Sequence, residues 1–316
     1  MKTILLKSIF TTALFGLLNI CYSQNTALHF DTLTTHVQTT YPGIAGGSQA
    51  RTIEAWIKTT SNHNPTGGGK QGVIADYGTF VTGGRFTFNV LWSNAIRLEV
   101  GGNGLSGSIA VNDGNWHHVA VVYDPTASNK YSLYVDSVLD VAGNLTVTTN
   151  TGAGNLRIGK RVDGAGGFRG SSAEVRFYNY ARTQAQVGGE RFDEYCTLPA
   201  GLVAYYKFNE GTAGGMNTGI TTATDNSGNG HTATLSNFAL SGSSSNWITG
   251  ATLTSSSGTN TFATFSATNC GSYTLPNGNT VTTSGTYVDT IPNTQCGDSI
   301  ITVNVTINNN TSSNPS

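Results

Sequence analysis

The sequence predicts an all-β protein, and three observations support that prediction. Charged residues make up only 10% of the 316-residue chain, whereas an average soluble protein has about 25%. Glycine is abundant, at 40 residues, and together with Ser, Thr and Asn it favours turns and strand surfaces over helix faces. Short segments of alternating apolar residues recur between Gly, Asn and Pro residues, at the spacing typical of a β-sandwich.

The first 23 residues have the composition of a signal peptide. Lys2 and Lys7 precede an apolar run at 9–20, and Ser23 is a small residue before the expected cleavage site. The apolar run is about a dozen residues long, whereas a membrane-spanning helix needs roughly 20. We therefore expect a protein that is secreted or held at the cell surface and that has no transmembrane span.

From residue 24 onward the alternating pattern predicts a series of short strands. The segments are 27–30, 36–38, 51–58, 72–77, 86–90, 96–100, 155–158 and 173–178. A hairpin of residues 115–124 and 131–136 lies among them, and its first strand carries apolar residues on both faces, so we expect it to be buried on both sides. A helix is predicted within 183–195, with Thr183 as its N-cap, although Gly188 and Gly189 weaken a long helix.

Four motifs occur in order along this part of the chain. They read Glu-Ala-Trp-Ile at 54–57, Trp-His-His-Val-Ala-Val-Val-Tyr-Asp at 116–124, Leu-Tyr-Val-Asp at 133–136 and Glu-Val-Arg-Phe-Tyr-Asn at 174–179. In order and spacing they resemble the laminin-G-like, or pentraxin-like, jelly roll of the concanavalin A-like lectin/glucanase group. The resemblance implies an antiparallel jelly-roll β-sandwich over residues 24–200. It also implies rim loops that in relatives often hold calcium and a glycan or protein ligand.

Residues 201–251 look like the opening of a second domain of the same family. A complete jelly roll does not fit in this length, so the segment either adds strands to the first domain or serves as a spacer. The apolar stretch at 202–208 favours docking, because it would otherwise expose a large apolar surface to water.

Residues 252–308 resemble the small immunoglobulin-like repeats of secreted and surface proteins of Bacteroidetes. A core of fewer than sixty residues is thin, and in an exported protein we expect a Cys270–Cys296 disulfide that contributes about 2–4 kcal/mol. Cys196 is then left over and is expected to be a buried thiol. Residues 309–316 form an Asn- and Ser-rich tail that we expect to be disordered.

The acidic residues do not favour an enzyme. Glycoside hydrolases of this fold need two carboxylates that project from one strand face, and none of the predicted strands carries such a pair. The acidic residues in the predicted helix and beside the hairpin turn are expected to be solvated; they are Glu190, Asp193, Glu194, Asp136 and Asp140. A formal net charge of −1 also argues against nucleic acid or an anionic membrane as a partner.

Metal and ligand sites are predicted in loops. His117 and His118 are adjacent and point to opposite faces of a strand, so they do not share a metal ion, and one is expected to be a hydrogen-bonded core residue. Calcium is the stronger candidate, as the resemblance implies, and Asp31, Glu174, Asp225 and Asn229 are the expected ligands. The turn at 225–230 is equally consistent with a plain Asn-Gly turn.

A glycan site would combine an exposed aromatic ring with polar side chains. The candidate residues on loops or loop edges are Tyr77, Trp92, Asn94, Asn103, Phe168 and Arg169, although inward packing is the commoner role of each aromatic taken singly. We therefore expect a non-catalytic binding or adhesion protein that binds a glycan or an extracellular protein surface. A polysaccharide-degrading hydrolase and a passive structural spacer are the alternatives.

Overall fold

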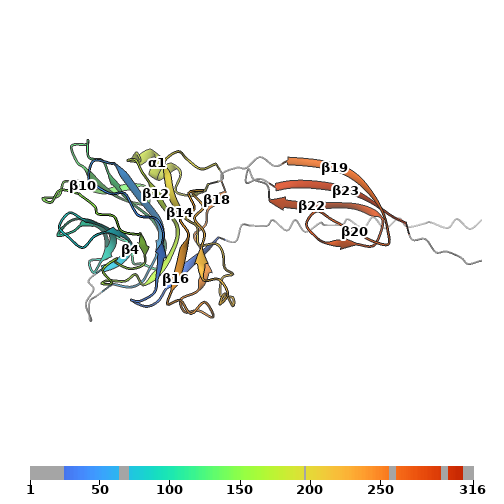
Figure 1. Cartoon of the computed structure of the whole chain (residues 1–316), viewed down its shortest axis with the longest axis horizontal. Coiled ribbons are helices and arrows are strands. Elements are labelled where there is room, and N and C mark those ends of the chain that lie inside the picture. The colour runs from blue at the N-terminus through green and yellow to red at the C-terminus, as the bar shows by residue number, and fades with distance from the viewer. Residues whose placement is uncertain (1–24, 64–70, 196, 256–260, 293–297, 309–316) are drawn as a thin grey trace, which may run out of the picture.

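A computed structural model describes residues 25–63, 71–195, 197–255, 261–292 and 298–308. The chain is all-β, with two large antiparallel sheets in a sandwich and a small additional sheet near the C-terminus (Figure 1). The first large sheet, sheet A, has eight strands. Seven of them are neighbours in the order β10 (Val138–Gly143), β9 (Tyr131–Val135), β8 (Trp116–Tyr123), β3 (Arg51–Lys58), β12 (Gly170–Tyr178), β1 (Thr26–Phe30) and β17 (Trp247–Thr249). The eighth, β14 (Leu202–Tyr206), pairs with β12.

The second large sheet, sheet B, faces sheet A across the core. Its order is β15 (Thr222–Ala223), β16 (Ala233–Ser236), β2 (His36–Thr39), β11 (Arg157–Ile158), β4 (Gln71–Gly78), β5 (Arg85–Leu91), β6 (Ala95–Val100) and β7 (Asn103–Ala110). Alternate residues of both sheets point inward and form one large core. Phe86, Phe88 and Val90 enter it from β5, and Val119 and Val121 enter it from β8.

The central strand β8 is buried on both faces, as its sequence predicts. Its outward residues Ala120 and Val122 pack with Val187 in a separate small cluster. Val187 belongs to the helix α1 (Gln184–Gly189), which begins at the predicted N-cap Thr183 with a capping box. The helix ends at Gly189 rather than near residue 195, because two consecutive glycines weaken its continuation.

Two of the three acidic residues after α1, Glu190 and Glu194, are partly buried and paired, which corrects the prediction that they are solvated. Glu190 accepts a bond from the hydroxyl of Tyr195 at 2.7 Å and pairs with Arg182. Glu194 lies 2.8 Å from Lys207. These contacts tie the segment after α1 to the outer face of sheet A.

The acidic residues of the hairpin turn are also engaged. Asp136 accepts bonds from the His117 ring at 2.7 Å and from the His118 backbone at 2.9 Å. Asp140 accepts bonds from the backbone of Ser108 on β7 at 2.9 Å. Asp136 therefore fixes the start of β8, and Asp140 joins β10 of sheet A to β7 of sheet B.

Residues 201–251 add strands to both sheets. β14 pairs with β12, β16 pairs with β2, and β17 pairs with β1. Trp247 of β17 is fully buried in the main core. The sandwich therefore continues past the predicted boundary at residue 200, because β1 and β2 each have an edge that these strands cover.

β12 changes partners at a bulge. Its first residues pair with β1, its later residues pair with β14, and its register with β3 shifts between Ala173 and Arg176. Glu174 lies at this shift with a positive φ of 53°, a conformation that is uncommon for a residue other than glycine. The bulge allows one edge of β12 to bind two strands in succession.

The C-terminal unit has its own small sheet. β19 (Thr261–Cys270) runs parallel to β23 (Asp298–Asn308), which pairs on its other side with β22 (Gly285–Pro292), while β20 (Tyr273–Thr274) and β21 (Thr280–Val281) form a short ladder. Another short ladder joins β13 (Asp193–Glu194) to β18 (Thr254–Ser255). The likeness of residues 252–308 to an immunoglobulin-like repeat stays a prediction.

Cys270 at the end of β19 is an exposed free cysteine in the structure, so the predicted bridge is not formed by this residue. Its expected partner Cys296, the leftover Cys196, the signal segment 1–23 and the tail 309–316 lie outside the described residues. The predictions for those residues stay predictions.

Candidate functional site

The outer face of sheet B carries a row of polar side chains. Asp76 on β4 lies directly opposite Thr87 on β5, and Thr87 lies opposite Glu99 on β6. On the other side of β4, Arg157 of β11 lies opposite Asp76. The row arises because apolar residues alternate with polar ones along β5 and β6, and the apolar set enters the core.

The buried guanidinium of Arg85 sits at the centre of this face. Its Nε lies 3.7 Å from Asp76 Oδ1, and its Nη1 lies 3.5 Å from Asp163 Oδ2. Its Nη2 pairs with Glu99, whose other carboxylate oxygen lies 2.6 Å from Arg97 Nη1. A buried charge is stable only when it is paired, so this network holds the side chains in fixed positions.

The two buried carboxyl groups of the row differ in their acidity. Burial raises the pKa of Asp76 to about 7, and hydrogen bonds from Thr87 and Val162 offset only part of that rise. Burial also acts to raise the pKa of Glu99, but a hydrogen bond from Gln71 and the charge of Arg97 outweigh it, and the pKa is lowered. Glu99 is therefore an anion at neutral pH, where it can accept hydrogen bonds from a ligand.

The loop between β4 and β5 presents an aromatic ring beside this network. Phe80 is 69% exposed, and the guanidinium carbons of Arg85 and Arg161 lie 5.1 and 5.7 Å from its ring centroid. Backbone bonds hold the loop in place, among them Gly83 N to Gly101 O at 3.0 Å. Gly101 is required there, because a Cβ at this residue would lie 2.2 Å from the Val81 carbonyl oxygen.

These residues line a cavity of about 480 Å³, which we call the Phe80 cavity. Its lining residues are Phe80, Val81, Thr82, Arg85, Glu99, Gly101, Gly102 and Arg161. An exposed phenyl ring can stack on the apolar face of a ligand, while guanidinium donors and the Glu99 carboxylate can bind its hydroxyl groups. The arrangement suits a polar ring-shaped ligand.

None of the six predicted ligand-binding residues lines the Phe80 cavity. Tyr77 and Phe168 are buried, which corrects their assignment as surface aromatics. The Tyr77 hydroxyl accepts a bond from Arg51 at 2.8 Å, and the Phe168 ring packs against Phe30 at 6.1 Å. Both rings belong to the main core. Tyr77 points inward from β4, and Phe168 lies in the loop just before β12.

The other predicted ligand-binding residues lie elsewhere on the surface. Trp92 is 62% exposed, but it lies at the opposite end of β5 from Phe80. Asn94 forms the turn between β5 and β6 with a φ of 72°, and the Asn103 side chain accepts a bond from the Thr146 backbone at 3.4 Å. Arg169 lines a second cavity of about 470 Å³ at the end of sheet A.

The four predicted calcium ligands do not form one site. Glu174 is buried and lies 2.7 Å from Arg176, and Asp31 accepts a bond from the Ser245 hydroxyl. The Asp225 carboxylate accepts bonds from three backbone amides, those of Tyr205, Ser227 and His231, at 2.9–3.0 Å. The Asn229 side chain donates a bond to the Val203 carbonyl at 3.2 Å. The carboxylates of Glu174, Asp31 and Asp225 are engaged in holding turns and strands, so the four residues do not fit a shared calcium ion.

The two adjacent histidines point to opposite faces, as predicted. His118 is buried, with its Nε2 3.6 Å from Glu54, and burial is the main reason that its pKa is lowered. The ring of His117 donates to the carboxylates of Asp136 and Asp113 at 2.7 and 3.1 Å, and the bond to Asp136 is the main reason that its pKa is raised. Among the described residues, no group of three or more His, Cys, Asp or Glu side chains could hold a metal ion.

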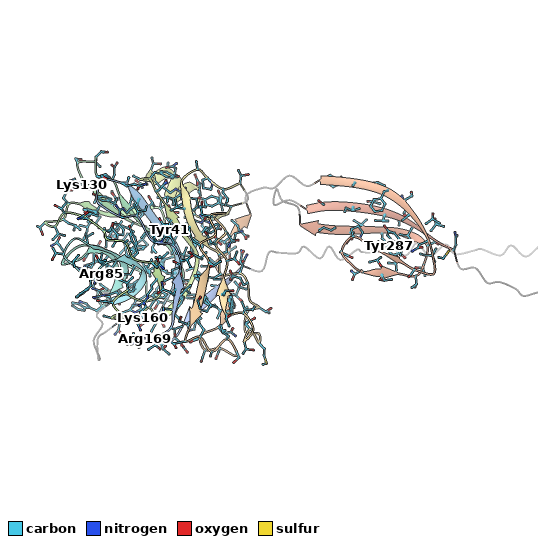
Figure 2. The ribbon with its side chains drawn as sticks, in the orientation of Figure 1. Tyr41, Arg85, Lys130, Lys160, Arg169 and Tyr287 are labelled. Carbon is cyan, nitrogen blue, oxygen red and sulfur yellow. The ribbon has the colours of Figure 1, made fainter. Side chains whose placement is uncertain are left out.

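Within the part of the chain that the structure describes, no helix has the length and apolar character needed to cross a membrane. The Phe80 cavity and the cavity at the end of sheet A are similar in size and share no lining residue. Figure 2 labels Arg85, which lines the first, and Arg169, which lines the second, at different places in the sandwich.

Comparison with protein families matches residues 31–188 to the model described as concanavalin A-like lectin/glucanases superfamily. A search of curated proteins found no match to this chain. Among solved structures, the chain is similar to a Bacteroides ovatus protein reported as a candidate carbohydrate-binding protein, with 20% identity and a TM-score of 0.48. That likeness covers 67% of this chain and 58% of the other chain, so this chain spans less than two thirds of that protein.

Two other solved structures are similar over smaller parts of this chain. The heptameric SAP-like pentraxin of Limulus polyphemus has 16% identity and a TM-score of 0.42, with 56% of this chain and 84% of that chain covered. The CBM40 of the Ruminococcus gnavus IT-sialidase, solved with α2,3-sialyllactose, has 19% identity and a TM-score of 0.37, with 45% and 83% covered.

Proposed function

Because the chain belongs to the concanavalin A-like lectin/glucanases superfamily through residues 31–188, we propose that it is a non-catalytic carbohydrate-binding protein. Its glycan site is the Phe80 cavity. The composition of residues 1–23 supports a place outside the cell, either secreted or at the cell surface.

The observation that carries this proposal is the exposed Phe80 ring beside fixed charged groups. Phe80 and its neighbour Val81 are 69% and 61% exposed, both line the cavity, and a contiguous apolar patch with a polar rim can mark a ligand-binding groove. Arg85 and Glu99 are already paired and locked in position, so little side-chain entropy is lost when a ligand binds them. A sugar ring offers an apolar face to Phe80 and hydroxyl groups to the two charged residues.

The catalytic alternative requires two carboxyl groups that reach the ligand. Glu99 lines the cavity, and its neighbour in the polar row, Asp76, does not. Asp76 is fully buried, and its carboxylate lies beneath the Val162 backbone, which donates a bond to Oδ2 at 2.7 Å. The raised pKa of Asp76 is therefore a consequence of its burial in a structural network, and binding is favoured over hydrolysis.

The first prediction concerns Phe80. We expect the purified chain to bind at least one oligosaccharide on a glycan array, and we expect Phe80→Ala to weaken that binding about tenfold, as measured by calorimetry, through the loss of ring stacking. Glu99→Gln should weaken it as well. Trp92→Ala is the matched control, because it removes an almost equally exposed aromatic ring away from the cavity.

Three results would overturn the proposal. A blank array would exclude glycan binding as the function. Weaker binding in Trp92→Ala but not in Phe80→Ala would move the site to the other end of β5. Release of new reducing ends from a bound polysaccharide, and its loss in Glu99→Gln, would establish the hydrolase alternative.

A further inference from the structure

The second cavity lies on the outer face of sheet A, where β1 and β3 end and β12 begins. We call it the Lys58 cavity; its volume is about 470 Å³. Its lining residues are His29, Phe30, Asp31, Lys58, Thr59, Thr60, Ser61, Gly114, Arg169, Gly170, Ser171, Ser243 and Ile248. Most of these side chains are polar, and they come from five separate segments of the chain.

Strand register brings the central residues of this cavity together. His29 on β1 lies opposite Ser171 on β12, and Ser171 lies opposite Lys58 on β3. Lys58 in turn lies opposite Trp116, the first residue of β8. Neighbouring strands are about 4.8 Å apart, so the row places an imidazole, a hydroxyl, an ammonium and an indole side by side on one face.

The two strong cations of the cavity, Lys58 and Arg169, form no ion pair with any of the described residues. Among the described residues, neither the Lys58 ammonium nor the Arg169 guanidinium makes a hydrogen bond or an ion pair. The cavity contrasts with the outer face of sheet B, where Arg85 is neutralised by acidic side chains. Two unpaired cations at one cavity attract an anion, since charge-assisted bonds to carboxylate or sulfate oxygens are among the strongest in proteins.

The remaining titratable groups of the cavity leave it positive at neutral pH. Asp31 is the one carboxylate among the described lining residues, and it accepts a bond from the Ser245 hydroxyl. His29 Nδ1 lies 2.9 Å from the Ser171 hydroxyl, and burial lowers the pKa of His29 although the charge of Asp31 opposes this. His29 is therefore neutral at pH 7, and two cations face one anion.

The wall of the cavity that contains residues 59–61 is fixed before any ligand arrives. The Thr59 hydroxyl donates to the Arg169 carbonyl at 2.6 Å. The Thr59 carbonyl accepts a bond from the Gly114 amide at 3.0 Å. The buried ring of His63 stacks on Phe168 at a centroid distance of 5.6 Å and anchors the end of this segment. A preformed wall reduces the entropy that is lost on binding.

We propose that the Lys58 cavity is a second ligand site, which binds the carboxylate or sulfate group of an acidic saccharide. Lys58 and Arg169 bind the anionic group, and the hydroxyls of Thr60, Ser61 and Ser243 and the Asp31 carboxylate bind neighbouring sugar hydroxyls. The saccharide part of this inference rests on the proposed function, whereas anion binding rests on the two cations alone.

The experiment compares three tetrasaccharides in calorimetric titrations with the full chain. The probes are an oligogalacturonate, a sulfated galactan fragment and a neutral galactan fragment. We expect at least one acidic probe to bind and to weaken with added salt. The double variant Lys58→Gln with Arg169→Gln should lose at least about tenfold in affinity for it.

The matched control is Lys130→Gln with Lys160→Gln. It changes the net charge by the same amount, and neither residue lines the Lys58 cavity. An equal loss in this control would reduce the effect to non-specific charge attraction and overturn the proposal, as would the absence of binding by both acidic probes.

Phe80→Ala separates the two proposals. Unchanged binding of the acidic probe in this variant supports a distinct second site, whereas its loss would place the acidic ligand in the Phe80 cavity instead. The ratio of affinities for the carboxylate and sulfate probes identifies the anionic group. Thermal unfolding of each variant verifies that it is folded.

Discussion

Burial shifts the pKa of single residues in this sandwich, and His63 is the clearest case. Its ring is 3% exposed, and it stacks on Phe168. Gly72 is required beneath it, because a Cβ there would lie 2.4 Å from the ring. Burial lowers the pKa of His63 to about 4, with a smaller contribution from the positive charge of Arg169.

The second prediction is the effect of pH on His63. The folded-state pKa is about 4 and the unfolded-state pKa is about 6.5, so between these values the unfolded chain binds a proton that the folded chain does not. The free energy of unfolding should therefore fall as the pH decreases from 6.5 to 4, by up to about 3 kcal/mol from this residue. Urea unfolding across this pH range should show that the His63→Phe variant loses correspondingly less stability than the original chain.

His29, His36 and His118 also have lowered pKa values and act in the same direction. His117 has a raised pKa and acts in the opposite direction, since its contribution is lost as the pH rises. The difference in the free energy of unfolding between the original chain and His63→Phe isolates the contribution of His63. Parallel stability curves for the two proteins would contradict the prediction.

Residues in the two sites could be predicted only in part. The alternation of Arg85, Thr87 and Asn89 with apolar residues on β5 is visible in the sequence, as is that of Arg97 and Glu99 on β6, and it was the available signal for a polar outer face. Which rows these residues form depends on strand register, which the sequence leaves open. Phe80 was missed because nothing in its local sequence distinguishes an exposed aromatic from a core one.

At the scale of elements, the apolar strands were predictable and the polar ones were not. The predicted segments from 27–30 to 173–178 correspond to β1–β6, β8, β9, β11 and β12. β7 was missed because its sequence, Asn-Gly-Leu-Ser-Gly-Ser-Ile-Ala, has few β-forming residues. β10 was missed because it is an exposed edge strand with a bulge opposite β9, and tertiary pairing rather than propensity determines it.

The third prediction concerns β17. Trp247 is fully buried in the main core, and it lies opposite Leu28 of β1. Trp247→Ala should lower the free energy of unfolding of the sandwich by about 3–5 kcal/mol, because it leaves a large cavity. Denaturant unfolding would measure this loss.

Trp92→Ala is again the control, and its effect should be within about 0.5 kcal/mol, because the ring is mostly exposed. If the two variants have equal stability, residues 201–251 contribute little to the sandwich and act as a spacer.

At the scale of the whole molecule, the C-terminal unit has its own sheets and its own core. Among the described residues, none of its strands β19–β23 pairs with a strand of the two large sheets. Its small core is made of Leu275, Val303, Val305 and Ile307 with their partly buried neighbours. The unit therefore makes its own hydrogen bonds and its own apolar contacts.

The fourth prediction follows from this separation. A chain that ends at Ser255, after β18, should unfold within about 3 °C of the full chain in calorimetry, which corresponds to less than about 1 kcal/mol. It should also keep the binding of glycans at both cavities. A larger loss of stability would mean that the C-terminal unit supports the sandwich through contacts other than strand pairing.

The position of β1 between β12 and β17 also determines when the sandwich can be completed. β1 precedes both of its partner strands along the chain, and Leu28 pairs with Ser172 on one side and Trp247 on the other. Pairings between such distant segments are slow to form, since a long loop must close first. A nascent chain therefore carries this strand without its native partners until β12 has been synthesised, and this edge of the sheet is completed only when β17 follows.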